Sequence, residues 1–321
     1  MSAKKIFSIL LAVVFAVSTL TACGSVAAEP TAPDIIIEPD SEKIPLAVAP
    51  AIPTMLLPVA SGVDVRKNSK AQIDVSNMKD GYVMIRYLGS ANANLRVLIT
   101  GPSNVQYTYF LRADGQYEVF PLSDGNGRYT IGVFRNIRGN QFATDFSTSI
   151  NVTLTDAFAP FLRPNQFVNF NENTLAVKKA AELVAGVDGT IEKVGKIYNY
   201  VISNFTYDRQ LAESVQSGYV PDLDKVWQAR KGICFDYASL TAAMLRSQGI
   251  PTKLVVGYAG KVYHAWISVW TEEEGWIDGI IYFDGKEWKL MDPTFAASAR
   301  SSANVMAFIG DGKNYAVRFL Y

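Results

Sequence analysis

The chain has 321 residues, of which 49% are apolar, so it is long enough to bury the cores of two domains of ordinary size. It carries 30 basic and 30 acidic residues, and its formal net charge is zero. This balance argues against nucleic acid as a partner and against a polybasic membrane contact.

The first 22 residues have the pattern of an export signal. Lys4 and Lys5 form a short basic start, and the apolar run 6–20 is shorter than the roughly 20 residues that span a membrane. The run ends in Leu-Thr-Ala before Cys23, which resembles the lipobox of bacterial lipoproteins. The resemblance implies that Cys23 is acylated and becomes the new N-terminus, and several acyl chains on one residue anchor a protein stably. We therefore expect an exported, extracytoplasmic chain that is lipid-anchored to the cell membrane; the alternative is an ordinary secretory signal that happens to contain Cys23.

Residues 23–62 are rich in Ala, Pro and acidic residues and show no helical or strand period, which predicts a tether. The apolar stretch 55–57 leaves a second option, in which this part packs on the next domain.

Residues 63–157 are predicted to form a small all-β sandwich. Short runs of branched and aromatic residues recur at even spacing and are separated by Gly and Asn, which is typical of that class. Asp114-Gly115 predicts a tight hairpin between two of these strands. Two roles are open for the tyrosines of these strands, core packing or a carbohydrate-binding platform. We expect core packing for Tyr107, Tyr109 and Tyr117. The expected strands are 72–75, 82–87, 95–99, 107–111, 116–120, 129–134 and 147–154.

Residues 165–321 change to helical patterns followed by strand patterns, which predicts an α+β domain. Thr190 is the expected N-cap of the second helix, and Gly249 and Pro251 end the last helix. Asp284-Gly285 predicts a tight hairpin between the last two strands. The expected helices are 175–185, 190–202, 224–230 and 235–248, and the expected strands are 253–258, 263–270, 280–283 and 287–291.

Cys234 is the one cysteine that remains if Cys23 is acylated, and it stands at the start of the most regular predicted helix. Unpaired N–H groups and the helix dipole at such a position stabilise a thiolate relative to a thiol. Gly232, two residues earlier, allows backbone or substrate to approach closely. Taken alone, Cys234 fits a buried structural cysteine equally well.

The histidine and an aspartate complete a possible triad. His264 is the single histidine of the chain, and strand alternation places it on one face with Trp266 and Ser268. Asp292 follows at the end of the last expected strand. A cysteine nucleophile needs a base within hydrogen-bond reach, and that base needs an acceptor that fixes its tautomer. Cys234, His264 and Asp292 offer a nucleophile, a base and an acceptor, in that order along the chain.

Four segments then resemble the bacterial transglutaminase-like superfamily in order and spacing. They are 231–238 (Lys-Gly-Ile-Cys-Phe-Asp-Tyr-Ala), 245–251, 264–266 (His-Ala-Trp) and 292–295 (Asp-Pro-Thr-Phe), and Tyr207-Asp208 resembles a further recurring element. The resemblance covers about residues 196 to 295 and implies a papain-like α+β core. It also implies that Cys234 is the nucleophile, His264 the general base and acid, and Asp292 the group that orients His264.

The chemistry of such triads is the cleavage of an amide through a thioester on the cysteine. The oxyanion of the intermediate needs donors, for which the Cys234 N–H and the Tyr207 hydroxyl are candidates. Trp266 either covers the site or serves in packing. The stretch 271–288 either forms part of the wall of the substrate site or is an insertion without a functional role.

Three functions remain open from the sequence. The first is a thiol amidase or peptidase on protein or peptide substrates, cell-wall peptides included, and the second is a transglutaminase that joins Gln and Lys side chains. The third is a surface binding or scaffold protein that retains the fold without turnover. No metal site is expected, since one His and one available Cys fall short of the usual zinc ligand set. We also expect no cofactor, because no phosphate-binding or dinucleotide-binding glycine motif is present.

Overall fold

The computed structural model describes residues 52–273, 275–278, 281–283, 288–290 and 315–321. These residues belong to one compact unit. The export signal, Cys23, most of the predicted tether and Asp292 lie outside the described residues. None of the described helices is long and apolar enough to cross a membrane.

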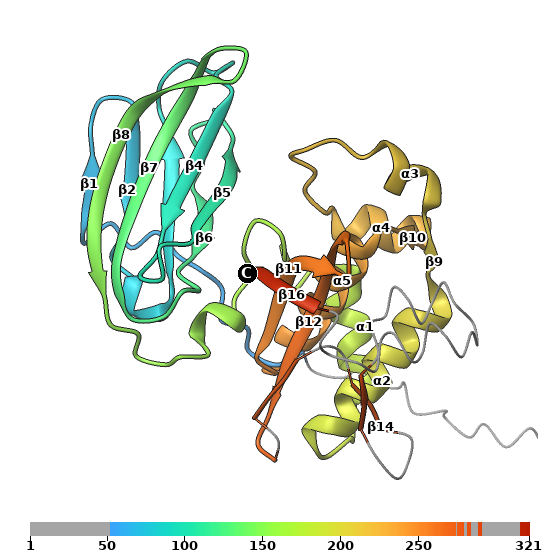
Figure 1. Cartoon of the computed structure of the whole chain (residues 1–321). Coiled ribbons are helices and arrows are strands. Elements are labelled where there is room, and N and C mark those ends of the chain that lie inside the picture. Colours follow the sequence, from blue (N-terminus) through green and yellow to red (C-terminus); the bar gives the residue numbers. More distant parts are fainter. Residues whose placement is uncertain (1–51, 274, 279–280, 284–287, 291–314) are drawn as a thin grey trace, which may run out of the picture. The chain divides into compact units, whose positions relative to one another are not determined.

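The N-terminal half forms two four-stranded antiparallel sheets, as predicted (Figure 1). The first has the order β1-β2-β3-β6 and the second the order β5-β4-β7-β8. The strands are β1 (Val65–Lys67), β2 (Ala71–Asp74), β3 (Tyr82–Tyr87), β4 (Leu95–Thr100), β5 (Gln106–Leu111), β6 (Glu118–Pro121), β7 (Gly127–Arg138) and β8 (Gln141–Val152), with the 3₁₀ helix η1 (Met78–Asp80) before β3.

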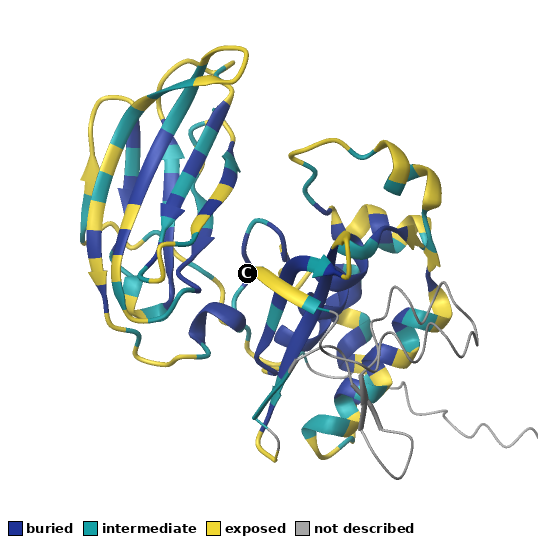
Figure 2. Ribbon diagram, in the orientation of Figure 1, coloured by how far each residue is buried: buried dark blue, intermediate teal, exposed yellow. Residues whose placement is uncertain are grey.

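Alternation along the strands builds the sandwich core. In β4 every second residue is buried, beginning with Leu95, and β5 shows the same alternation (Figure 2). Successive side chains of a strand point to opposite faces, so each sheet turns one apolar face inward. Tyr107 and Tyr109 are buried in this core, which confirms that they serve in packing.

The predicted hairpin at Asp114-Gly115 is wrong. The turn exists, since Gly115 has a φ of 77° and Asp114 accepts a hydrogen bond from the Gln116 N–H. The strands on either side do not pair with each other, however: β5 pairs with β4, and β6 pairs with β3. The turn therefore carries the chain from one sheet to the other.

The end of the predicted tether belongs to the sandwich. The Gly62 N–H donates to the Asp74 carboxylate at 2.7 Å, and the Val59 N–H donates to the Tyr82 hydroxyl at 3.1 Å. Met55 also packs against the hydrophobic core. Of the two options that the sequence left for 55–57, Met55 follows the second and packs on the next domain, whereas Leu56 and Leu57 are exposed.

The C-terminal half is the expected α+β core. Its main sheet has the order β13-β12-β11-β16, and α5 packs against β11 and β12 (Figure 1). The elements are η2 (Ala159–Phe161), α1 (Leu175–Val184), α2 (Thr190–Asn204), β9 (Thr206–Tyr207), α3 (Arg209–Ser214), α4 (Leu223–Ala229), β10 (Lys231–Gly232), α5 (Cys234–Arg246), β11 (Thr252–Ala259), β12 (Val262–Thr271), β13 (Gly275–Asp278), β14 (Ile281–Phe283), β15 (Trp288–Leu290) and β16 (Tyr315–Leu320).

Helix α5 is the centre of this half. Every residue from Asp236 to Arg246 is buried, since other helices and the sheet surround it (Figure 2). Gly249, with a φ of 76°, follows the helix as expected. Thr190 is the first residue of α2 and Gly189 its N-cap, one position before the predicted cap. Strands β14 and β15 pair antiparallel, and the predicted turn at Asp284-Gly285 lies outside the described residues.

Candidate active site

Cys234 is the first residue of α5, and the residues around it shape the start of that helix. The preceding residue, Ile233, is extended, and its N–H donates to the Asp236 carboxylate at 2.8 Å. An acidic residue at the third helical position that accepts from the N-cap backbone is half of a capping box. This contact fixes the entry of the chain into the helix at Cys234.

Asp236 is fully buried and has a second donor, the Tyr219 hydroxyl, at 2.7 Å. Burial raises the pKa of Asp236, although the Ile233 N–H and the Tyr219 hydroxyl act in the opposite direction. A buried carboxyl with two donors is costly to disturb, so the first turn of α5 is held firmly.

Gly232 is required by Asp236. A Cβ at Gly232 would lie 2.7 Å from the Cβ of Asp236 and 3.0 Å from one of its carboxylate oxygens. The sequence predicted that Gly232 allows a close approach, and in the structure the approaching group is this capping side chain.

Cys234 itself is partly exposed, while the residues that follow the first turn are buried. The first N–H groups of a helix have no partner within it and are directed outward from its end. The Cys234 side chain therefore stands at the accessible, electropositive end of a buried helix.

His264 lies on β12, the strand against which α5 packs, and is 5% exposed. Its ring is nearly parallel to that of Trp266, with 6.2 Å between the centroids, so the two side chains share a face as predicted. Trp266 is buried and also packs edge-on against Tyr315, which is a role in the core. Gly257, opposite His264 on β11, leaves room for this layer, since a Cβ there would meet Trp266 at 2.9 Å.

The start of α5 and the His264 segment lie in the same region. Burial raises the pKa of Tyr263, with Tyr258 and Cys234 adding to the rise and Arg318 opposing it. Cys234 therefore lies within electrostatic range of Tyr263, and the packing of α5 on β12 is consistent with this proximity. Asp292, the third predicted member of the triad, lies outside the described residues.

Tyr207 lies beside the approach to Cys234. Strands β9 and β10 pair in parallel and match Tyr207 with Gly232, and the Asp208 N–H donates to the Gly232 carbonyl at 2.8 Å. Lys231 and Asp208 add an ion pair at 3.1 Å. The structure therefore brings Tyr207, predicted as an oxyanion donor, next to the segment that leads into α5.

Sequence reasoning missed the pair Tyr219 and Asp236. Asp236 could have been found, because an acidic residue three positions after the N-cap is a known helix-start signal. Tyr219 sits in a loop and carries no such signal. Within the described residues, no group of three His, Cys, Asp or Glu side chains gathers to hold a metal ion.

The model of the transglutaminase-like superfamily matches residues 177–279. A protein-glutamine gamma-glutamyltransferase of Pseudomonas aeruginosa is 34% identical over 68 residues, or 17% of this chain and 10% of that protein. An uncharacterized protein of Mycobacterium leprae is 31% identical over 138 residues, or 39% of this chain and 46% of that protein. The chain thus spans less than half the length of these relatives.

Among solved structures, one from Cytophaga hutchinsonii, named provisionally as a cysteine protease, is 15% identical and has a TM-score of 0.37. That likeness covers 81% of this chain and 74% of the other. The segment that the family model matches includes Cys234, His264 and the β9–β10 pair. Residues 177–279 are thus similar to the transglutaminase-like superfamily.

Proposed function

We propose that this chain is a cysteine-dependent enzyme that acts on amide bonds of protein or peptide substrates through a thioester. The observation that carries the proposal is that Cys234 begins a buried helix, and that this helix packs on the strand of the chain's single histidine. A nucleophile on a helix start and a base on an adjacent strand form the pair that thiol catalysis requires.

The reaction begins with attack of the Cys234 Sγ thiolate on a carboxamide or peptide carbonyl carbon. The tetrahedral intermediate collapses as protonated His264 gives its proton to the departing nitrogen, which leaves as ammonia or an amine. A thioester on Cys234 remains. Neutral His264 then accepts a proton from the incoming water or amine, which attacks the thioester and releases the thiolate.

The developing oxyanion needs donors placed in advance. The Cys234 N–H at the start of α5 is one candidate, and the Tyr207 hydroxyl is the second because β9 runs beside Gly232. Asp292 has the role that the family resemblance gives it, acceptance of a hydrogen bond from the His264 ring. We assign Trp266 and Gly232 to supporting roles.

The fate of the thioester depends on whether water or an amine reaches it first. Incubation of the full chain with a Gln-containing peptide, with and without a primary amine, separates the outcomes by mass. Incorporated amine identifies a transglutaminase, whereas deamidation or cleavage identifies a hydrolase. Cys234→Ala and His264→Ala should each lower the rate by about 10³-fold or more, and Val262→Ala on the same strand should retain it.

Alkylation tests the pairing of the two groups without a substrate. The Cys23→Ser chain has Cys234 as its single thiol, so the labelling rate reports that residue alone. We expect iodoacetamide to react faster at mildly acidic pH than with a free cysteine, and His264→Ala to abolish the difference. Equal alkylation rates in the Cys23→Ser chain and its His264→Ala variant, together with no turnover, would support a non-catalytic binding or scaffold protein instead.

We also propose that the enzyme works outside the cytoplasm, anchored through lipid on Cys23. The support is the sequence at 4–23 alone. Mass spectrometry of the mature protein should find acyl chains on Cys23, and Cys23→Ala should move the protein out of the membrane fraction. An unmodified Cys23 in the mature chain contradicts this part of the proposal.

A further inference from the structure

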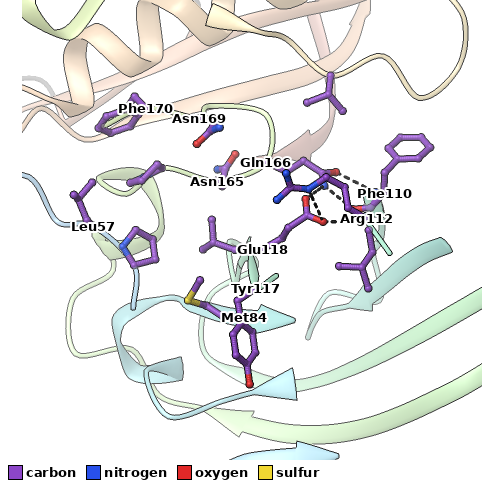
Figure 3. A pocket seen from close by; sticks show the side chains of 15 residues that line it. Leu57, Met84, Phe110, Arg112, Tyr117, Glu118, Asn165, Gln166, Asn169 and Phe170 are labelled. Atoms are coloured by element: carbon purple, nitrogen blue, oxygen red, sulfur yellow. Dashed lines mark hydrogen bonds and ion pairs between the residues drawn. The ribbon is translucent and has the colours of Figure 1, made fainter. Parts of the chain in front are cut away.

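A cavity of about 530 Å³ is lined by residues that include neither Cys234 nor His264. Figure 3 shows the side chains that line it. Strands β5 and β6, the segment 164–170 and Val220 form most of its wall. Its volume is in the range of pockets that bind small molecules and short peptide segments. The side chains that matter for the argument are Phe110, Arg112, Tyr117, Glu118, Gln166 and Phe170.

The cavity borders the groups that hold the first turn of α5. Gln166 lines it, and the next residue, Phe167, has its ring 5.3 Å from that of Phe235, which follows Cys234. On the other side Val220 lines it, and the preceding Tyr219 donates to the buried Asp236. An occupant of the cavity would thus lie against both segments that frame the start of the helix.

The wall is suited to a polypeptide chain. Both β5 and β6 are edge strands of their sheets, and sheet edges pair with extended chains. At Phe110 a carboxamide already makes such a pair, since the Gln166 side chain accepts from the Phe110 N–H at 3.0 Å and donates to the Phe110 carbonyl. The backbone groups of Phe110 are therefore already paired, and the Arg112 N–H donates to Glu118 at 2.7 Å, so a polypeptide would bind at this edge by replacing the Gln166 amide.

The wall also carries one positive and one negative side chain, Arg112 and Glu118, which offer hydrogen-bond donors and acceptors. Arg112 is 64% exposed and lies 3.4 Å from Glu118, so its guanidinium keeps N–H groups available to a ligand. Met84, Val119 and Phe170 supply apolar surface beside this pair. A chain of alternating amides and side chains uses all three kinds of contact.

A sugar fits the same wall less well. Carbohydrates stack on open aromatic faces, but Arg96 covers one face of Phe110 at 4.2 Å and Arg86 covers one face of Tyr117 at 4.6 Å. The geometry points to this cavity as the binding site for the polypeptide that flanks the reacting amide of the substrate. This inference rests on the proposed function and adds the place on the molecule where the substrate polypeptide binds.

Two tryptophan substitutions test the inference. Val119 pairs with Met84 across β6 and β3, and both line the cavity, so Val119→Trp fills it. Thr108→Trp, exposed on β5 and outside the cavity lining, is the matched control. Arg112→Ala changes the wall at an exposed side chain and guards against misfolding of the first variant, which circular dichroism would detect.

Binding is measured by fluorescence anisotropy with fluorescein-labelled β-casein, a disordered polypeptide, on full chains that carry Cys234→Ala. We expect Val119→Trp to raise the Kd by about 10-fold or more and Arg112→Ala to raise it by a smaller factor, with Thr108→Trp within about 2-fold of the parent. With Cys234 present, kcat/KM for β-casein should fall in the same order, and Thr108→Trp should keep the parent's kcat/KM for both β-casein and a capped Gln-Gly dipeptide.

The inference is overturned if Val119→Trp and Arg112→Ala bind β-casein as tightly as the Thr108→Trp control. It is also overturned if chitotetraose, and not β-casein, binds in a way that Val119→Trp abolishes, since the cavity would then be a glycan site. Because the anisotropy measurement uses catalytically inactive chains, its result is independent of whether Cys234 is a nucleophile. Failure of the cavity and failure of the enzyme are therefore distinguishable.

Discussion

The sandwich and the layer around α5 are both well packed, but they bury different kinds of side chain. The buried positions of β2 to β8 are mainly branched aliphatic and aromatic residues, with Asp74 a polar exception. Around α5 the buried set includes Asp236, Arg246 and His264, and also Ser239, Thr241 and Ser268. Buried polar groups destabilise a fold unless each finds a partner, so they gather where function requires them. The same substitution should therefore have different consequences in the two regions.

Arginine gives the largest expected contrast. Arg246 is 2% exposed and donates to the main-chain oxygens of Thr252, Arg163 and Tyr321. Burial lowers its pKa to about 9, which leaves it charged at neutral pH. Arg246→Met removes these donors from buried oxygens and should lower the free energy of unfolding by on the order of 3 kcal/mol.

Arg135 of the sandwich is the control for Arg246. It is 35% exposed, and its partner Asp145 keeps Lys70 at 2.9 Å and Tyr87 at 2.7 Å. Arg135→Met should therefore cost less than about 1 kcal/mol. Urea denaturation measures the free energy of unfolding of both variants. Equal losses would mean that the buried polar side chains around α5 contribute no more to stability than those on the sandwich surface.

Glycine gives the second contrast. In Gly232→Ala the new Cβ would press on the Asp236 side chain, and we expect a loss of about 2 kcal/mol together with a reduced kcat, because the start of α5 shifts. In Gly115→Ala nothing lies within 4 Å of the new Cβ, and the cost of about 1 kcal/mol comes from the φ of 77°. Urea denaturation and kcat are measured for both variants. A drop in kcat for Gly115→Ala would contradict the expectation that only Gly232 affects the start of α5.

Local patterns in the sequence predicted most elements of both regions. Strand β3 begins and ends at the expected residues, since its alternating aromatic and aliphatic run is bounded by a glycine. Helix α5 ends at Arg246, close to the predicted end at 248 before Gly249 and Pro251, and the candidates Cys234 and His264 came from the family motifs. These features depend on a few neighbouring residues, which is why the sequence reveals them.

Pairings between distant segments were not predictable in the same way. Strand β16 was not expected, and it exists through its pairing with β11 and the contact of the Ser123 hydroxyl with Leu320. The assignment of β5 and β6 to different sheets likewise depends on partners far along the chain. Tyr219 contacts Asp236 from a loop that has no periodic pattern. These contacts join segments far apart in the sequence, so neither a turn signal nor a residue type predicts them.

Tyrosine gives the smallest and most specific contrast. Tyr219→Phe removes the hydroxyl that donates to the buried Asp236, and a lost hydrogen bond to a carboxyl of this kind should cost about 1.5 kcal/mol. Tyr109→Phe removes a buried hydroxyl of the sandwich that has no hydrogen-bond partner among the described residues. That change deletes a polar atom already deprived of water, so it should be neutral or slightly stabilising.

The two Tyr→Phe variants differ from the parent by one oxygen atom each, which makes their comparison free of volume effects. The free energies of unfolding should separate them by about 1.5 kcal/mol, with Tyr109→Phe at or above the parent. Turnover adds a second readout, since Tyr219 supports the first turn of α5 through Asp236, whereas Tyr109 packs against Phe120 of the sandwich. If Tyr219→Phe matched Tyr109→Phe in both stability and kcat, the buried contact at Asp236 would have no part in holding Cys234 in place.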